Sequence, residues 1–224
     1  MAKRSGETVE EIRDKLKRMF SLNMLVPGQR LVYRDLAEKL NTSTTPIIQA
    51  LRALEHSGLV RHDHNKGYYV EEMTIKEAEE LFLAREALEI VLLPDVVQNL
   101  NEGTIGSIRQ RVKDYQYTLS PDHRRGAVLR DAKFHLLIAE CAGNKVIYSL
   151  LEQIFERISL KYTPEYQWES RVKEVIKQHK EILEALSKGK AAETQKLMRS
   201  HIREGQDHVI ASLKSVKQME GDVT

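Results

Sequence analysis

Four side chains that can bind a metal ion lie on apolar helical stripes in the second half of this 224-residue sequence. Asp131 and His135 are four residues apart and are therefore adjacent on one face of a predicted helix. His179 interrupts an apolar stripe, and His201 shares a helix face with Leu197 and Met198. A set of imidazoles and a carboxylate suits zinc, nickel, manganese or iron, and a cation would balance a carboxylate that is otherwise costly to bury.

Each histidine taken singly has an ordinary explanation, because a core histidine is usually hydrogen-bonded to a carbonyl group. Four coincident positions on inward stripes favour a metal site over that explanation. His208, seven residues after His201, shares its face but has a less dense apolar neighbourhood, so we leave it out. The predicted ligands are Asp131, His135, His179 and His201, with zinc as the first choice of divalent ion.

Helices must position these ligands, and the hydrophobic period of 3.6 predicts six of them. They cover residues 74–100, 104–119, 121–142, 145–162, 164–187 and 190–213. Pro94 is expected to kink or break the first one. We therefore predict a mainly α protein, in which residues 73–224 form an antiparallel six-helix bundle.

Residues 1–72 show a different organisation, with three predicted helices followed by a β-hairpin. Thr8 and Glu11 form a capping-box pattern at the first helix, and Pro46 opens the third. The apolar period then changes from 3.6 to 2, with two short strands on either side of a turn at 62–67. This order is typical of a winged helix-turn-helix, which places its third helix in the major groove of DNA.

Polar and basic residues of this first domain are available for double-stranded DNA. Gln49 is suited to adenine, Thr44 and Thr45 offer hydroxyl or methyl groups, and the basic side chains suit phosphates. The predicted DNA-binding residues are Arg34, Ser43, Thr44, Thr45, Gln49, Arg52, Lys66 and Gly67.

Composition agrees with a polyanion partner and an intracellular setting. Residues 1–70 contain 12 Lys/Arg and 8 Asp/Glu, a net charge of +4, whereas the whole chain has +2. Cys141 is the single cysteine, which indicates a reducing compartment without an intrachain disulfide. The beginning of the sequence lacks a signal-peptide pattern, and the apolar run at 90–93 is too short for a bilayer. We expect a cytoplasmic protein with no membrane partner.

The proline, glycine and leucine pattern of the first domain resembles the DNA-binding module of GntR-superfamily regulators. The resemblance is carried by LVPGQRL at 25–31, RDLAE at 34–38, TPI at 45–47, ALRALE at 50–55, GLV at 58–60 and GYYV at 67–70. The family usually has arginines where this chain has Thr44 and Ile48. Because each good bidentate base contact contributes about 1–3 kcal/mol, we expect a different operator preference and a lower affinity.

The second domain resembles the FCD effector domain of the FadR-type branch, through DAKFH at 131–135, AGN at 142–144, QHKEILEAL at 178–186 and MRSHI at 198–202. Six helices resemble the VanR-like subgroup. In metal-containing members an Asp and three His bind a divalent cation, and all four match here. The resemblance implies a homodimer on a palindromic operator, controlled by a small carboxylate effector.

Three residues are candidates for binding that effector. Arg85 matches a pattern residue of the branch and is the first candidate, followed by Asn144 and Arg157. The alternative for Arg85 is a surface salt bridge with Glu89, one helical turn further on.

Two other functions are open for the metal site. The metal could be purely structural, in which case removing it would leave effector affinity unchanged. An Asp and three His with open positions could also activate water, as in a metallohydrolase. The sequence contains no GxSxG, CxxC, Walker or dinucleotide-binding motif, and no carboxylate is suggestively spaced as a general base. We therefore predict a regulator and not an enzyme.

Overall fold

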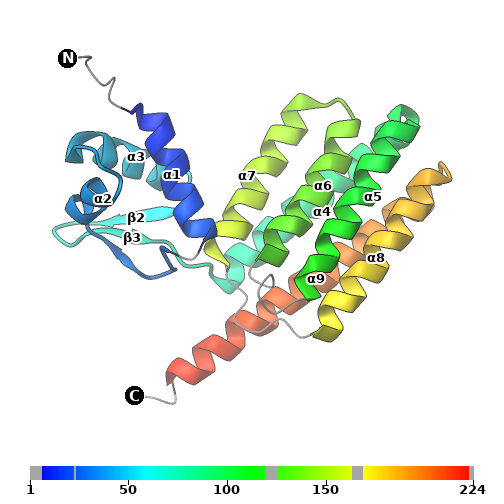
Figure 1. The fold of residues 1–224 in the computed structure, drawn as a ribbon. Helices are drawn as coiled ribbons and strands as arrows, with labels where there is room; N and C mark the ends of the chain where they lie inside the picture. The colour runs from blue at the N-terminus through cyan, green and yellow to red at the C-terminus, as the bar shows by residue number, and fades with distance from the viewer. Residues whose placement is uncertain (1–6, 23, 120–125, 163–168, 222–224) are drawn as a thin grey trace. The chain divides into compact units, whose positions relative to one another are not determined.

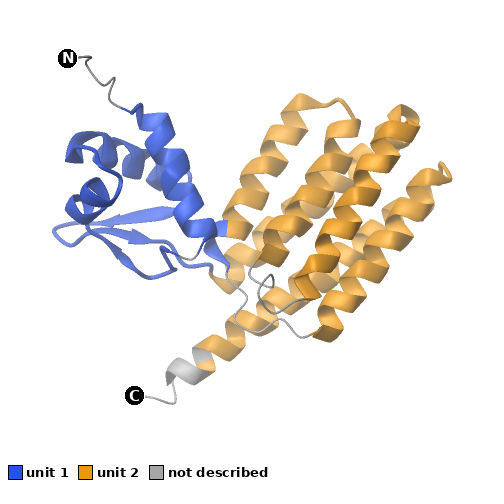
Figure 2. Ribbon diagram, viewed as in Figure 1, with its two compact units in different colours: residues 1–73, 160–162 blue, residues 74–159, 163–224 orange. Residues whose placement is uncertain are grey.

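The chain divides into two compact units, drawn in different colours in Figure 2. Unit 1 comprises residues 1–73 and 160–162, and unit 2 comprises residues 74–159 and 163–224. The computed structural model describes residues 7–22, 24–119, 126–162 and 169–221. Each unit is described by itself below.

Three helices form the core of unit 1 (Figure 1): α1 (Val9–Ser21), α2 (Tyr33–Lys39) and α3 (Thr44–His56). The capping box at α1 is present, since the Thr8 side chain accepts a hydrogen bond from the Glu11 amide and the Glu11 side chain accepts one from the Thr8 amide. The helices bury the apolar residues that the helical period predicts, among them Ile12, Leu16, Leu36, Ile47, Leu51 and Leu54. The predicted three-helix core is confirmed.

A small antiparallel sheet completes unit 1. Its strands are β1 (Arg30–Leu31), β2 (Val60–Asp63) and β3 (Gly67–Val70), in the order β1-β3-β2. Asn65 and Gly67 have φ values of +64° and +96°, which suits the turn residues asparagine and glycine. The sequence predicts β2 and β3 but misses β1, because two residues are too few to display an alternating pattern.

Six α-helices make up the described part of unit 2, as predicted. They are α4 (Ile75–Asn99), α5 (Glu102–Gln116), α6 (Ala127–Cys141), α7 (Lys145–Lys161), α8 (Glu169–Ser187) and α9 (Ala191–Gly221), with the 3₁₀ turn η1 (Tyr117–Leu119) after α5. The predicted starts of two helices, at 121 and 164, fall outside the described residues. Among the described helices, none is long and apolar enough to cross a membrane.

The packing of unit 2 brings helices that are far apart in sequence into contact. α4 packs against α6 and α9, while α8 packs against α5 and α9 (Figure 1). These contacts bring the inward faces of α4, α6, α8 and α9 toward a common core, whose side chains are described below.

Pro94 does not break α4, which continues through it to Asn99. A proline lacks an N–H group, so the carbonyl of Ile90, four residues earlier, loses its helical partner. The Gln195 side chain on α9 donates a hydrogen bond to this carbonyl, with an Nε2–O distance of 3.1 Å. The expectation of a break is therefore wrong, because a neighbouring helix supplies the hydrogen bond that the proline cannot make.

Candidate metal centre and DNA-binding face

The structure brings together all four predicted metal ligands. Asp131 and His135 come from α6, His179 from α8 and His201 from α9, and their ligand atoms lie within 4.8 Å of one another. The three imidazoles are buried, whereas the Asp131 side chain keeps 19% of its surface exposed. Residues up to 70 positions apart in sequence thus form one compact, largely buried cluster.

The spacing of the ligand atoms fits a single cation. Asp131 Oδ1 lies 3.1 Å from His179 Nε2, 3.5 Å from His201 Nε2 and 3.6 Å from His135 Nε2. The Nε2 atoms of His135 and His201 are 3.0 Å apart. Neighbouring ligand atoms around an ion bound at about 2.1 Å are separated by about 3.0–3.4 Å. The four residues are therefore able to hold a divalent metal ion.

His135 is held by a carboxylate from α4. Its Nδ1 atom lies 2.6 Å from Glu89 Oε2, while the other carboxylate oxygen of Glu89 accepts a hydrogen bond from Arg85 Nε at 2.6 Å. Arg85 also reaches Asp131, with an Nη2–Oδ2 distance of 3.5 Å, and lies 4.6 Å over the ring of Phe155. A buried network thus connects α4 with the metal-binding face of α6.

His201 is held by an amide. Its Nδ1 atom lies 2.8 Å from Gln178 Oε1. The Gln178 amide nitrogen donates to Glu204 Oε2, and because an ionised carboxylate only accepts, this bond fixes which end of the amide faces the histidine. Gln178 must therefore present its oxygen to His201.

His179 has a different environment. Its ring stacks on Phe134, with centroids 3.9 Å apart and an interplanar angle of 15°, and the edge of Tyr115 approaches it at 5.2 Å. Its Nδ1 atom is buried and has no hydrogen-bond partner among the described residues. Aromatic packing orients this third imidazole.

The electrostatics favour a cation. Burial raises the pKa of Glu89, but His135 and Arg85 outweigh that effect and lower it to about 2. Burial likewise opposes ionisation of Asp131, yet His135 above all, together with His179 and His201 beside the carboxylate, holds its pKa well below the usual value. Burial lowers the pKa of His201 to about 3. The cluster therefore contains two carboxylates that are ionised at neutral pH.

The pKa values of the other two imidazoles shift in opposite directions. Burial lowers the pKa of His179. Burial and Arg85 also lower that of His135, but the carboxylates of Glu89 and Asp131 outweigh them and raise it overall. His135 is thus the imidazole of the cluster whose surroundings favour the protonated form.

Only one of the three predicted effector residues has a described contact with this cluster. Arg85 forms the ion pair with Glu89 that we considered as its alternative role, but the pair is buried and not at the surface. Asn144 is exposed, and its side chain accepts a hydrogen bond from the Ile147 amide at the start of α7. Arg157 on α7 forms an ion pair with Glu77 on α4. A role for Asn144 and Arg157 in effector binding stays a prediction.

The predicted DNA-binding residues of α3 lie on its exposed side. Thr45, Gln49 and Arg52 are exposed and follow one helical stripe, while Ile47 and Leu51 are buried on the opposite face. Ser43 is exposed at the N-cap, where its side chain makes no capping hydrogen bond, and Thr44 is half-buried. The exposure of this α3 stripe is compatible with a role in reading DNA bases.

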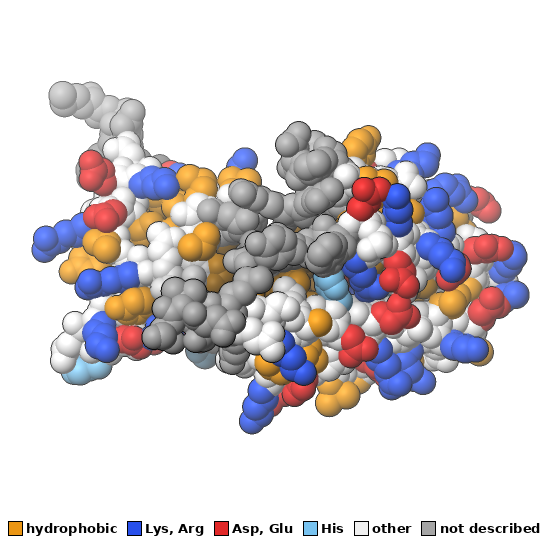
Figure 3. All heavy atoms as spheres, turned by 90° about the horizontal axis from the view of Figure 1, so that it is seen from below, with side chains coloured by type: hydrophobic (Ala, Val, Ile, Leu, Met, Phe, Trp, Pro, Cys, Tyr) orange, Lys and Arg blue, Asp and Glu red, His pale blue; other side chains and the backbone are white. Residues whose placement is uncertain are grey.

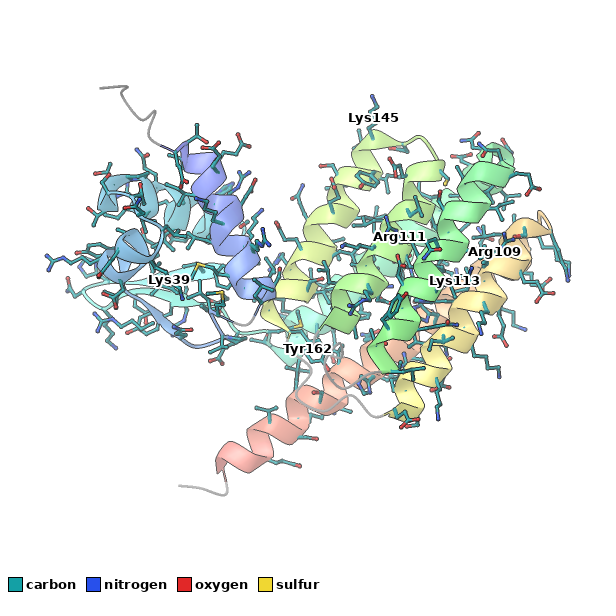
Figure 4. The ribbon with its side chains drawn as sticks, in the orientation of Figure 1. Lys39, Arg109, Arg111, Lys113, Lys145 and Tyr162 are labelled. Atoms are coloured by element: carbon teal, nitrogen blue, oxygen red, sulfur yellow. The ribbon has the colours of Figure 1, made fainter. Side chains whose placement is uncertain are left out.

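The remaining predicted DNA contacts lie outside α3. Arg34 is exposed on α2, Lys66 is exposed at the hairpin turn, and Gly67 begins β3. Lys39, a further exposed cation on α2, was not among our predicted contacts (Figure 4). Acidic and basic side chains are interspersed over most of the described surface in Figure 3. Because a nucleic-acid surface is typically a continuous basic patch, this mixed face does not favour nucleic-acid binding.

A winged helix-turn-helix that precedes a helical bundle with a buried ligand cluster defines a DNA-binding regulator. The chain belongs to the GntR family of bacterial regulatory proteins, whose model matches residues 8–70, and it carries an FCD domain over residues 80–204. The prediction of a GntR-superfamily regulator with an FCD domain is confirmed. Because these families and the relatives below are transcriptional regulators, the prediction that the chain is not an enzyme is confirmed as well.

Curated relatives are similar over most of their length. The HTH-type transcriptional regulator YdhC of Bacillus subtilis (strain 168) is 23% identical over 206 residues, which cover 92% of each chain. McbR of Escherichia coli (strain K12) is 24% identical over 178 residues, covering 79% of this chain and 80% of McbR.

Solved structures show the same fold. The structure of E. coli McbR/YncC has a TM-score of 0.77 at 20% identity and covers 90% of this chain and 96% of its own. A putative GntR regulator from Rhodococcus sp. RHA1 has a TM-score of 0.79 at 18% identity, covering 91% and 97%.

Proposed function

We propose that this regulator senses a small organic acid through a divalent metal ion bound by Asp131, His135, His179 and His201. The observation that carries the proposal is the convergence of one carboxylate and three imidazole nitrogens, with separations suited to one ion. Zinc is our first choice because it accepts mixed imidazole and carboxylate sets, and nickel, manganese and iron are alternatives.

The charge of the cluster supports an anionic effector. With neutral imidazoles, Arg85 contributes one positive charge, while Glu89 and Asp131 contribute two negative charges, so the cluster carries −1. A divalent ion changes this charge to +1, and one carboxylate would neutralise it. Because Arg85 is already paired with Glu89, the metal itself is the better partner for the effector carboxylate.

Asp131 offers a route for such a ligand. It is the only one of the four ligands with appreciable exposure, at 19% of its side-chain surface. Four protein ligands leave positions open on a six-coordinate ion. An effector would then bind the ion from the side of Asp131.

We further propose that the protein acts in the cytoplasm as a homodimer on a palindromic operator, with α3 in the major groove of each half-site. The exposed stripe of Thr45, Gln49 and Arg52 supports this docking mode. The threonine and isoleucine at positions 44 and 48 favour an operator that differs from the common one of the family.

Fluorescence anisotropy with labelled promoter fragments tests this proposal. The protein is measured as purified, after chelation and after reloading with zinc, each with a panel of small organic acids and at several salt concentrations. We expect sequence-selective, salt-sensitive binding whose affinity changes with one acid in the zinc-loaded protein alone.

The variants H179A and H208A provide the matched comparison. His208 lies on α9 outside the cluster, so H208A should keep the acid response that H179A loses. A purely structural metal would instead leave effector affinity unchanged on metal removal. Absence of selective DNA binding under every condition would overturn the proposal.

A further inference from the structure

We infer that Glu89 and Gln178 are positioning residues that keep the protons of His135 and His201 on Nδ1 and so direct both Nε2 lone pairs at the metal. The inference rests on the proposed metal site. Neither residue is one of the four ligands, and Glu89 belongs to α4, which supplies no ligand.

Glu89 determines the tautomer of His135 because both of its oxygens are occupied. Oε1 accepts from Arg85 and Oε2 lies 2.6 Å from His135 Nδ1. An ionised carboxylate has no proton to donate, so Nδ1 of His135 must carry the hydrogen of this bond. The Nε2 atom is then the free lone pair, and it is the atom that faces Asp131 and His201.

Arg85 keeps Glu89 in place. Its guanidinium lies 4.6 Å over the Phe155 ring and 5.5 Å over the Phe82 ring, which limits its movement. The Arg85–Glu89 pair is almost completely buried, with side-chain exposures of 4% and 3%. Burial strengthens this ion pair, which holds the carboxylate in one orientation toward His135.

Gln178 determines the tautomer of His201 by a longer chain of bonds. Glu204 can only accept, so the amide nitrogen of Gln178 faces Glu204 and the amide oxygen faces His201. Nδ1 of His201 therefore donates, and Nε2 is left as the lone pair beside His135. Ser200 also donates to Glu204, at 2.9 Å, which helps to fix this carboxylate.

His179 is the internal contrast. No described residue hydrogen-bonds its Nδ1 atom, and stacking on Phe134 fixes only the plane of its ring. The one described acceptor for a proton on its Nε2 atom is Asp131 Oδ1 at 3.1 Å, which is itself a proposed ligand. Stacking therefore sets only the orientation of the His179 ring. The hydrogen bonds to Glu89 and Gln178 set both the orientation of the His135 and His201 rings and the nitrogen atom that carries the proton.

Zinc affinity, measured by competition with a chromophoric chelator, tests the inference in the full-length protein. Partners that orient a metal-binding histidine typically contribute about 10- to 100-fold to metal affinity. We expect E89Q to weaken zinc binding by a factor in that range and Q178M to weaken it by about 10-fold. The matched control for E89Q is E86Q, which removes another α4 carboxylate, one that is paired with Arg203. The matched control for Q178M is Q153M on the exposed side of α7. The zinc affinity of both controls should stay within about two-fold of that of the wild type.

Nitrogen-15 NMR of the histidine side chains separates positioning from a general loss of structure. Metal-free wild type should show His201 with its proton on Nδ1, and Q178M should shift part of that population to Nε2 while His179 is unchanged. Circular dichroism establishes whether each variant is folded. If E89Q does not fold, Q178M still tests the inference, because Gln178 is only half-buried.

The outcomes distinguish this inference from the proposed function. If the wild type binds no divalent metal, the proposed function fails and this inference fails with it. If the wild type binds zinc but E89Q and Q178M bind it equally well, with unchanged tautomers, this inference alone is overturned.

Discussion

The Nε2 atoms of His135 and His201 lie 3.0 Å apart in the core of the helical unit, although the residues belong to different helices. In the neutral tautomers that Glu89 and Gln178 impose, both atoms are lone-pair acceptors. Two such atoms repel each other unless a cation lies between them. A proton on His135, whose pKa is raised, can fill this role in the metal-free protein, and a metal ion displaces it.

Acid should destabilise the metal-free protein because of His201. Burial and the neighbouring His179 lower its pKa to about 3 in the folded chain, although the nearby Asp131 carboxylate opposes them. The unfolded chain binds this proton below about pH 6.5, so stability decreases as the pH falls from about 6.5 toward 3. His135 has the opposite effect in a different window, since its raised pKa contributes stability that is lost as the pH rises above about 6.5.

Urea denaturation of chelator-treated protein at about pH 7, 6 and 5 measures this dependence, because these values extend from above the pKa of an ordinary histidine into the window in which His201 contributes. H201Q cannot take up the proton and should show a flatter decrease than wild type. The control H64Q alters an exposed histidine of the hairpin turn and should follow the wild type. Equal slopes for wild type and H201Q would refute the prediction.

Loss of the Gln195 side chain should destabilise the helical unit without affecting DNA recognition. Q195L leaves the Ile90 carbonyl, which Pro94 already deprives of its helical partner, without a hydrogen bond. An unsatisfied buried acceptor costs about 1–3 kcal/mol, and partial exposure of Gln195 places the expected loss at about 1 kcal/mol. Thermal or urea denaturation measures this loss, with Q153L on the exposed surface of α7 as the control. Equal losses in the two variants would argue against a stabilising role of the hydrogen bond from Gln195 to the Ile90 carbonyl.

Arg52 should contribute to DNA affinity without selecting the sequence. If it contacts a phosphate, R52A weakens binding to all fragments similarly and reduces the slope of log affinity against log salt by about 1. R109A, an exposed arginine on α5 of the helical unit (Figure 4), is the control and should leave the slope unchanged. A change in sequence preference in R52A would instead indicate a base contact.

Gln49 should select a base. On the exposed stripe of α3 it is suited to a bidentate contact with adenine, which contributes about 1–3 kcal/mol of discrimination. Q49A should therefore lose preference at one position of each operator half-site while keeping the salt dependence. Binding-site selection from a random library measures this, and an unchanged preference in Q49A would exclude base reading by this residue.

The sequence predicts the four clustered ligands because helical periodicity shows which side of a helix faces the core. It does not show which residue of another helix lies opposite. Glu89 was therefore considered only as the partner of Arg85 in an alternative surface salt bridge, although it is buried against His135, and no role was predicted for Gln178. The position of Glu89 on the inward face of α4, where a carboxylate needs a buried partner, was the feature of the sequence that could have indicated its role.

The fold follows the same rule. Long helices with a clear apolar period were predicted to within a few residues where the structure describes them, except that α9 continues to Gly221 and does not end at the predicted residue 213. The strand β1 has only two residues and no detectable pattern. Where α4 continues through Pro94, the Ile90 carbonyl receives its hydrogen bond from Gln195, which is about 100 positions away in the chain and cannot be linked to it by any local pattern.

Metal content tests the central claim most directly. Elemental analysis of purified wild type, H179A and H208A, each dialysed against the same zinc buffer, compares a proposed ligand with a histidine outside the cluster. We predict about one zinc ion per chain in wild type and H208A, as expected for a single four-ligand site, and little or none in H179A. Equal metal content in wild type and H179A would contradict the assignment of the site.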